Sequence, residues 1–353
     1  MHLFVLAALA GPVERAVEAC EASDPQACLS AAVSYEAGRD VATDPFRAVE
    51  LYQKACELGL APGCTSLAWM YEKGRGTKVD LKRATQLYEG ACPADGRACA
   101  NLGNLLMATS AKQGTARYQQ SCDAGWRDGC LRLGEIYERG EGIPEDDAKA
   151  FEIYSAVCDS KYANGCTALG SLYEKGAHVE RDPAHAAQLY GVGCDHGDPV
   201  GCSLLGDLHK DGEGVQRSDD RATQLYEKAC NAGAIEGCAS LGVMVATGRG
   251  APRDDARALS LFERACEQGV PRGCSNLGVI FERGQGVPVD APRAVELYGR
   301  ACAGGHPMAC TNLGLMLAQG NGAPKDVPRA RQAFERACKL GHADGCRLGA
   351  KEW

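Results

Sequence analysis

The sequence lacks the features that usually mark a membrane protein or a nucleic-acid-binding protein. Its 353 residues contain no stretch approaching the ~18 consecutive apolar residues of a membrane-spanning helix. No run is rich in Lys or Arg and the net charge is −8, so the basic face that a nucleic acid requires is missing. Aromatic residues make up only 6% of the chain, which favours closely packed small side chains over one large core. We therefore predict no membrane span and no nucleic-acid partner.

Catalytic motifs are also missing. A serine hydrolase of the β-lactamase type needs Ser-x-x-Lys, Ser-Asp-Asn and Lys-Thr-Gly, and none of them occurs. The chain has no Gly-x-Ser-x-Gly elbow and no P-loop. A zinc enzyme needs clustered histidines, whereas those of this chain are scattered: His2, His178, His185, His196, His209, His306 and His342. The sequence predicts no catalytic residue, no metal ligand and no cofactor.

What the sequence does contain is 20 cysteines in ten regularly spaced pairs. The first members recur every 36 residues, apart from a 30-residue step between Cys92 and Cys122. Their partners follow eight residues later, or seven in the case of Cys99. The pairs are Cys20-Cys28, Cys56-Cys64, Cys92-Cys99, Cys122-Cys130, Cys158-Cys166, Cys194-Cys202, Cys230-Cys238, Cys266-Cys274, Cys302-Cys310 and Cys338-Cys346. Such a period indicates stacked supersecondary units, each contacting its neighbours.

Each repeat has the pattern of two helices. Ala258, Leu261, Phe262 and Ala265 recur at three- and four-residue spacing, which places them on one helix face. Twelve residues before nine of the first cysteines stands an expected N-cap: Asp44, Asp80, Ser110, Asp146, Asp182, Ser218, Asp254, Asp290 and Asp326. Four residues before the same cysteines stands an aromatic residue: Tyr52, Tyr88, Tyr118, Tyr154, Tyr190, Tyr226, Phe262, Tyr298 and Phe334. We predict that these aromatic residues form a packing ladder rather than a functional row.

The recurring pattern Arg-Ala-x-x-Leu-Tyr-x-x-Ala-Cys-x-x-Gly-x-x-x-Gly-Cys-x-x-Leu-Gly-x-x-Tyr-x-x-Gly-x-Gly resembles the Sel-like repeat, a relative of the tetratricopeptide repeat. In its Cys-x7-Cys form it is similar to the Helicobacter cysteine-rich protein family of secreted proteins. The likeness covers residues 12–353. It implies an all-α fold, a right-handed α/α solenoid of nine helix pairs with a half-repeat at each end, which we expect to be one domain over residues 11–353. It also implies weak β-lactamase or penicillin-binding activity, for which the sequence offers no motif.

The cysteine pairs are predicted to be disulfides. The first Cys ends one helix and the second starts the next, so an antiparallel helix hairpin can bring their Cα atoms within the ~4.4–6.8 Å that a disulfide needs. Zinc ligation is the first alternative, although the usual Cys-x2–4-Cys spacing is absent. Free thiols in a reducing compartment are the second. Disulfides persist in oxidising compartments, so we expect a periplasmic or secreted protein.

The N-terminus partly fits export. Residues 3–10 form a short apolar run that ends in Ala8-Leu9-Ala10, which fits a cleavage site, although the positive n-region is missing. We expect residues 1–10 to be a signal peptide. The alternative is the first turn of an N-terminal helix.

The regular spacing breaks once, over residues 92–122. Thr109 alone precedes the Ser110 cap, where other repeats have about six residues, and Gly114 weakens the following helix. We expect a local change of superhelical pitch. It is either a tolerated deletion in a surface turn or a kink that shapes a groove.

Candidate binding residues lie at positions +2 and +5 from the second cysteine, one helical turn apart. These positions vary between repeats, whereas the Leu at +3 and the Gly at +4 recur. The candidates are Trp69, Asn101, Asn104, Arg132, Glu135, Asn276 and Asn312. Asn can pair with peptide backbone and Arg with a carboxylate. The alternative is that they are solvated helix positions.

We therefore predict an exported, disulfide-rich repeat scaffold, expected to be monomeric, that binds a protein, a peptide or a cell-wall fragment in its concave groove. The preferred contact zone is formed by Asn101, Asn104 and Arg132. The family resemblance leaves a β-lactamase or penicillin-binding hydrolase as an alternative. An assembly factor of an intermembrane space is the second alternative.

Overall fold

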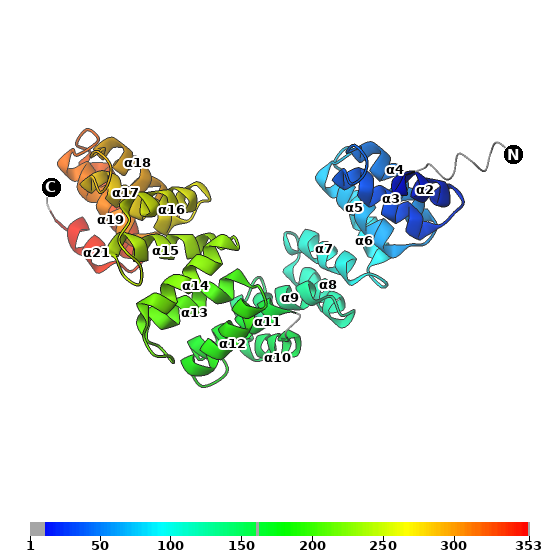
Figure 1. The fold of residues 1–353 in the computed structure, drawn as a ribbon, viewed down its shortest axis with the longest axis horizontal. Helices are drawn as coiled ribbons and strands as arrows, with labels where there is room; N and C mark the ends of the chain where they lie inside the picture. Colours follow the sequence, from blue (N-terminus) through cyan, green and yellow to red (C-terminus); the bar gives the residue numbers. More distant parts are fainter. Residues whose placement is uncertain (1–10, 160–161, 352–353) are drawn as a thin grey trace. The chain divides into compact units, whose positions relative to one another are not determined.

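The computed structural model of the protein describes residues 11–159 and 162–351, and these contain helices but no strand (Figure 1). Contacts divide the chain into a first unit, Met1–Val157, and a second unit, Cys158–Trp353. The signal-peptide prediction for residues 1–10 lies outside the described residues. The helices of the first unit are α2 (Pro12–Glu21), α3 (Pro25–Ala37), α4 (Pro45–Glu57), α5 (Ala61–Lys73), α6 (Leu81–Ala91), α7 (Gly96–Met107), α8 (Ala111–Asp123), α9 (Arg127–Arg139) and α10 (Asp147–Val157).

The second unit continues the same alternation. Its helices are α11 (Ala163–Lys175), α12 (Pro183–Asp195), α13 (Pro199–Asp211), α14 (Asp219–Asn231), α15 (Ile235–Thr247), α16 (Asp255–Glu267), α17 (Pro271–Arg283), α18 (Ala291–Ala303), α19 (Pro307–Gln319), α20 (Val327–Lys339) and α21 (Ala343–Gly349). The odd-numbered helices begin near a second cysteine, and we call them second-cysteine helices. The even-numbered ones end near a first cysteine, and we call them first-cysteine helices. Within the described chain, nine pairs run from α3–α4 to α19–α20, with α2 and α21 as half-repeats, which confirms the predicted all-α solenoid.

The predicted caps start the first-cysteine helices. The Asp44 carboxylate accepts from the backbone N–H groups of Phe46 (3.1 Å) and Arg47 (3.0 Å), which α4 cannot satisfy internally. The equivalent contact recurs at the other eight predicted positions. Second-cysteine helices other than α7 and α21 end instead on a glycine such as Gly74, whose φ of 67° suits a residue without a Cβ.

The aromatic residues form the predicted ladder, and all nine are at most 2% exposed. Each of seven rings lies against the glycine at +4 of the preceding second-cysteine helix. A Cβ on Gly170, for example, would lie 2.8 Å from the Tyr190 ring. In these seven repeats the recurring Leu-Gly therefore has a physical cause, because a Cβ would crowd the ring; the first two repeats have Ala32 and Ala68 at this position instead.

All ten predicted disulfides form, with Cα atoms 4.3–4.6 Å apart. This confirms the disulfide interpretation over zinc ligation and free thiols. Among the described residues, no group of three or more His, Cys, Asp or Glu side chains is placed to hold a metal ion. No helix in the described part of the chain is both long enough and apolar enough to cross a membrane.

The irregular repeat has a shortened connection. Only residues 108–110 join α7 to α8, whereas residues 74–80 join α5 to α6. A Cβ on Gly114 would lie 2.6 Å from the Met107 sulfur and 2.9 Å from the Met107 backbone nitrogen. Gly114 is therefore required for the close approach of α8 to the end of α7, and it does more than weaken the helix.

Candidate functional site

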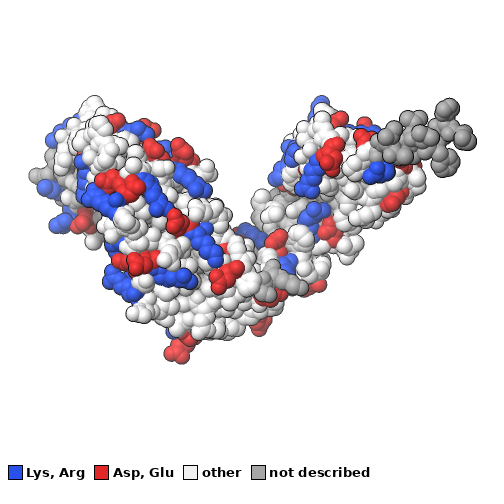
Figure 2. Space-filling model, viewed as in Figure 1, with Lys and Arg blue, Asp and Glu red and all other residues white. Residues whose placement is uncertain are grey.

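Successive second-cysteine helices contact one another from α3 to α9 in the first unit and from α11 to α17 in the second. These helices carry every predicted binding position. In the view of Figure 2, positive and negative side chains are interspersed over the surface. On the side of the molecule that Figure 2 shows, recognition would therefore depend on local groups rather than on a field of one sign.

The ladder tyrosines reach the second-cysteine helices with their hydroxyl groups. Tyr88 donates to Glu72 (2.9 Å), Tyr154 to Glu138 (3.0 Å) and Tyr298 to Glu282 (2.6 Å). In each case the acceptor lies sixteen residues earlier in the sequence, on the paired second-cysteine helix. Burial, followed by the effect of the carboxylate, raises the pKa of these tyrosines far above the ordinary value. The hydroxyls are therefore protonated donors, which makes them unsuited to act as bases.

The residues at +2 meet the same hydroxyls from the other side. The Asn101 amide donates to the Tyr88 hydroxyl oxygen (3.4 Å). Arg132 and Asn312 stand at the same position beside Tyr118 and Tyr298, and each acts to lower the pKa of the neighbouring tyrosine. Predicted binding residues therefore also lie against the ladder, which was not predicted from the sequence.

A pocket of about 290 Å³ in the first unit brings two predicted residues together. Trp69 of α5 and Asn101 of α7 line it, along with Glu36, Thr65, Ser66 and Arg97. The Arg75 guanidinium lies over the Trp69 ring, 5.4 Å from its centroid, and pairs with Glu36 at 3.5 Å. The pocket thus combines an aromatic surface with hydrogen-bond donors and one carboxylate.

Arg97 also lines the pocket, although it was not predicted from the sequence to be a binding residue. It stands two residues before Cys99 and donates to the Ser66 hydroxyl (3.5 Å) and to the Pro62 carbonyl (3.5 Å) of the preceding repeat. Its position, two residues before the second cysteine, varies in charge from repeat to repeat. That variation was the signal that could have identified it.

The other predicted residues lie elsewhere. Asn104 is exposed and accepts from the Tyr118 hydroxyl. Arg132 pairs with Glu135 (3.1 Å) and Glu141 (3.1 Å), and the hydrogen bond to Glu141 raises the pKa of Arg132 and lowers that of Glu141. These contacts engage the Arg132 guanidinium within the chain.

Asn276 and Asn312 belong to the second unit. Asn312 contacts the ladder as described, whereas the ladder residue facing Asn276 is Phe262, which has no hydroxyl. The Asn276 amide nitrogen has no hydrogen-bond partner among the described residues.

The repeats match a known repeat pattern. The Sel1 repeat pattern matches residues 25–60, 61–92, 127–160, 163–198, 199–233, 235–270, 271–306 and 307–342. A search of curated protein sequences finds no match.

Two solved Sel-like repeat structures share the fold. A protective antigen of uropathogenic Escherichia coli that displays an SLR fold is 23% identical, with a TM-score of 0.62 over 97% of this chain and 84% of its own. A Sel1 repeat protein from Oxalobacter formigenes is also 23% identical, with a TM-score of 0.59 over 68% of this chain and 96% of its own. The cysteine-rich protein B of Helicobacter pylori is 30% identical over 38% of this chain and 96% of its own, with a TM-score of 0.32.

Proposed function

The chain belongs to the Sel1 repeat family, and on that basis we propose that it is a non-enzymatic protein-interaction scaffold of an oxidising compartment. It binds a protein, a peptide or a cell-wall fragment on the face of its second-cysteine helices. The contact zone is the pocket around Trp69 in the first unit. This moves the preferred zone from Asn104 and Arg132, which are engaged within the chain, toward Trp69, Arg97 and Asn101.

The observation that carries the proposal is the composition of that pocket. Trp69 is only partly buried, and its ring offers a flat apolar surface between the α3 and α7 side chains. Large aromatic residues and arginines are the usual anchors of protein interfaces. Arg97 and Asn101 supply donors for carbonyl or carboxylate groups, and Glu36 supplies an acceptor. This combination suits a polypeptide, which presents both kinds of group together with apolar side chains.

The disulfides support the choice of compartment. All twenty cysteines are paired, and disulfides are rare where glutathione and thioredoxin keep thiols reduced. A periplasmic or extracellular location, reached through the proposed signal peptide, is consistent with this redox requirement.

Capture experiments test the proposal. Oxidised, immobilised protein is exposed to an extract of its native compartment, and the captured proteins are quantified by mass spectrometry. We expect Trp69→Ala combined with Asn101→Ala to deplete specific partners at least about tenfold, because anchor residues typically contribute about 2 kcal/mol. Circular dichroism checks that the variant is folded.

Trp126→Ala is the matched control, because Trp126 is exposed but lies outside the pocket. It should retain the same partners. Retention of every partner by the double variant would show that the pocket is not the contact zone. Turnover of a chromogenic β-lactam by the oxidised protein would favour the hydrolase hypothesis instead.

A further inference from the structure

Two buried polar atoms are left without a hydrogen-bond partner in the described part of the chain: Ser203 Oγ on α13 and Asn276 Nδ2 on α17. Both helices contact α15, which lies between them. Buried polar groups are almost always paired, because an unpaired one costs about 1–3 kcal/mol. Two such atoms within three successive repeats call for an explanation.

Ser203 lacks the partner that its position has in other repeats. One residue after the second cysteine, Thr65 donates to the N-cap carboxylate of the next second-cysteine helix, Asp95, at 2.6 Å. Thr311 contacts the N-cap imidazole of His342 at 2.9 Å in the same way. The N-cap opposite Ser203 is Ala234, which offers no side-chain acceptor. Ser203 therefore lacks an internal partner because of Ala234, and Asn276 lacks one because it faces Phe262; of these two residues, Ser203 lines the pocket described next.

Ser203 lines a pocket of about 540 Å³ formed by α13, α15 and α17. Val200, Leu204 and Val270 make its surface mainly apolar. The volume is within the range of ordinary ligand pockets and accommodates several side chains. Val200 is 52% exposed, so the apolar surface is open to an incoming group.

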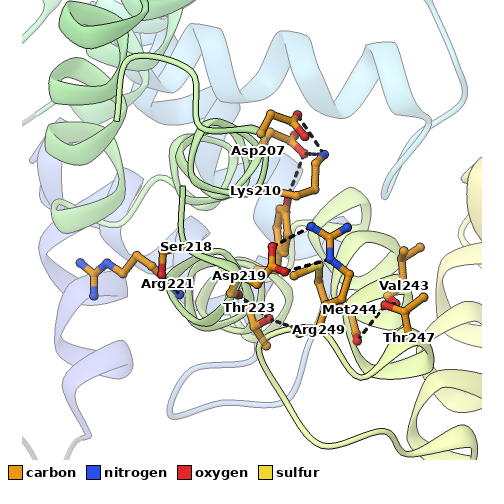
Figure 3. A network of polar contacts seen from close by, with 12 residues as sticks. Asp207, Lys210, Ser218, Asp219, Arg221, Thr223, Val243, Met244, Thr247 and Arg249 are labelled. Carbon is orange, nitrogen blue, oxygen red and sulfur yellow. Dashed lines mark hydrogen bonds and ion pairs between the residues drawn. The ribbon is translucent and has the colours of Figure 1, made fainter. Parts of the chain in front are cut away.

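The charged groups of the pocket differ in how far they are already engaged. Asp207 accepts from Lys210 (2.8 Å) and from Tyr226 (2.7 Å), as Figure 3 shows for the Asp207–Lys210 pair. Arg272 is exposed at the start of α17 and donates to Ser240 of the preceding repeat. A guanidinium has five N–H donors, so the contact with Ser240 orients the group and leaves it able to take a carboxylate with two parallel hydrogen bonds.

The exposed Glu236 stands between Val200 and Arg272 at the equivalent position of α15. Its carboxylate can accept peptide N–H groups. Along three successive helices the pocket therefore presents an apolar patch, an acceptor and a cation, which is an order that an extended peptide can match.

We propose that this pocket binds an extended peptide segment whose carboxylate pairs with Arg272 and whose neighbouring aliphatic side chain packs on Val200, Leu204 and Val270. The carboxylate comes from an acidic side chain or from the peptide's own C-terminus. The inference rests on the proposed function in treating the chain as an interaction scaffold, but it uses a different unit and different residues.

The test uses three pools of fluorescent hexapeptides, randomised at the other positions, and the oxidised full-length protein. The first pool carries an internal Leu-Glu and an amidated end, the second ends in Leu with a free carboxylate, and the third is the second pool amidated. We expect the first or the second pool to bind, as measured by fluorescence polarisation, and the third to bind at least about tenfold more weakly. The pool that binds shows whether the carboxylate belongs to an acidic side chain or to the peptide's C-terminus.

Substitutions in the pocket test whether the peptide binds there. Arg272→Ala and Val200→Asp should each weaken it at least about tenfold, and both side chains are exposed enough to be replaced without unfolding the helix. Ser203→Ala should weaken it, because the unpaired Ser203 hydroxyl in the pocket lining can donate to a peptide carbonyl. The melting temperature should be unchanged or raised, because this hydroxyl has no partner within the described chain to lose.

Arg347→Ala is the matched control, since Arg347 is exposed in the second unit and lies outside the pocket. Arg97→Ala tests the other candidate site, since Arg97 occupies the same repeat position as Arg272 and also contacts a serine, but lies in the first unit. Binding that survives Arg272→Ala and is lost in Arg97→Ala would overturn this inference while supporting the site of the proposed function. Failure of all three pools to bind would overturn the inference alone, because the capture experiment at Trp69 is independent of it.

Discussion

At the residue scale, every ladder hydroxyl except that of Tyr118, which donates to the Asn104 amide oxygen, is matched by an acid. Where the ladder residue is Tyr at the regular spacing, the residue sixteen earlier is Glu36, Glu72, Glu138, Glu174 or Glu282. Tyr226 has Lys210 at that distance, and its hydroxyl is accepted by Asp207 one helical turn away. Where the ladder residue is Phe262 or Phe334, the residue sixteen earlier is Ala246 or Ala318. The acids therefore occur where a buried hydroxyl needs an acceptor, which explains them without catalysis.

The Tyr190–Glu174 pair tests whether the acid is there to accept a hydrogen bond from the buried tyrosine hydroxyl. The Tyr190 hydroxyl donates to the Glu174 carboxylate, and Tyr190 is fully buried. Tyr190→Phe should lower the free energy of unfolding by about 1–2 kcal/mol, because it removes a hydrogen bond to a charged acceptor. Adding Glu174→Ala, which recreates the Phe–Ala combination used elsewhere in the chain, should cost little more. A double-mutant cycle in urea measures the coupling, and additive effects would contradict the pairing.

His306 gives a pH-dependent prediction. Its Nδ1 accepts from the Ala309 backbone N–H (3.2 Å) at the start of α19, which requires a neutral ring. Burial, then the charges of Arg272 and His342, lower the pKa of His306 below its ordinary value. The unfolded chain then binds the proton more tightly. The stabilisation is therefore present above the unfolded pKa of about 6.5 and is lost as the pH falls through the folded pKa.

His306→Asn should flatten that dependence, because Asn can cap the helix but does not titrate. Between about pH 7.5 and pH 5, the melting temperature of the variant should fall less than that of the unchanged protein. Calorimetry at matched ionic strength measures both. Parallel curves would show that another group causes the pH dependence.

The ladder and the caps could be predicted from the sequence because both stand at fixed distances from a cysteine. The binding site could be predicted only in part. Asn101 and Asn312 have the polarity and spacing of ligand-binding residues, yet their amides meet tyrosines on another helix, a contact that helix periodicity does not reveal. The rule that pairs Tyr with Glu and Phe with Ala is visible in the sequence and could have indicated it. The role of Arg97 depends on contacts across repeats and required the structure.

At the scale of elements, the second glycine of each Gly-x-Gly loop sets how closely neighbouring repeats stack. The loop after a second-cysteine helix lies on the start of the preceding first-cysteine helix. A Cβ on Gly250 would lie 2.1 Å from the Asp219 carbonyl oxygen, and one on Gly76 would lie 2.1 Å from the Pro45 carbonyl oxygen. Beside Gly250, Arg249 forms two hydrogen bonds with the Asp219 side chain, at 2.7 and 2.9 Å (Figure 3). The loop is thus a contact between repeats rather than a spacer.

Comparing Gly250→Ala with Gly269→Ala separates two causes of destabilisation: the steric clash of a new Cβ and the penalty for a positive φ. Both residues have a positive φ, 64° and 83°, so each substitution carries the left-handed penalty of about 1–2 kcal/mol. No atom lies within 4 Å of a Cβ on Gly269 in the described chain, so Gly269→Ala should cost no more than this conformational penalty. Gly250→Ala should cost at least about 1 kcal/mol more, because Asp219 must move. Equal losses in chemical denaturation would show that the loop contact is unimportant.

At the scale of the whole molecule, stability is distributed along the chain. The cores of both units are divided into local clusters built from neighbouring repeats, such as the cluster around Tyr52 and Leu67 and that around Tyr88 and Leu102. In such a stack, total stability is close to a sum of repeat and nearest-neighbour contributions. A disulfide that closes a loop of about nine residues adds roughly 2–3 kcal/mol in the chain-entropy model. The disulfides therefore strengthen each hairpin where a shared central core is lacking.

Removing one internal and one terminal disulfide tests this distribution. Replacing Cys230 and Cys238 by Ala loosens the α14–α15 hairpin, which has neighbours on both sides, so hydrogen exchange should increase through α13–α16. Replacing Cys338 and Cys346 loosens the α20–α21 hairpin at the end of the stack, so the increase should be confined to those two helices. Local opening of this kind is expected where each repeat contacts only its neighbours. A uniform increase over all described helices in both variants would instead mean that the chain unfolds as one cooperative unit.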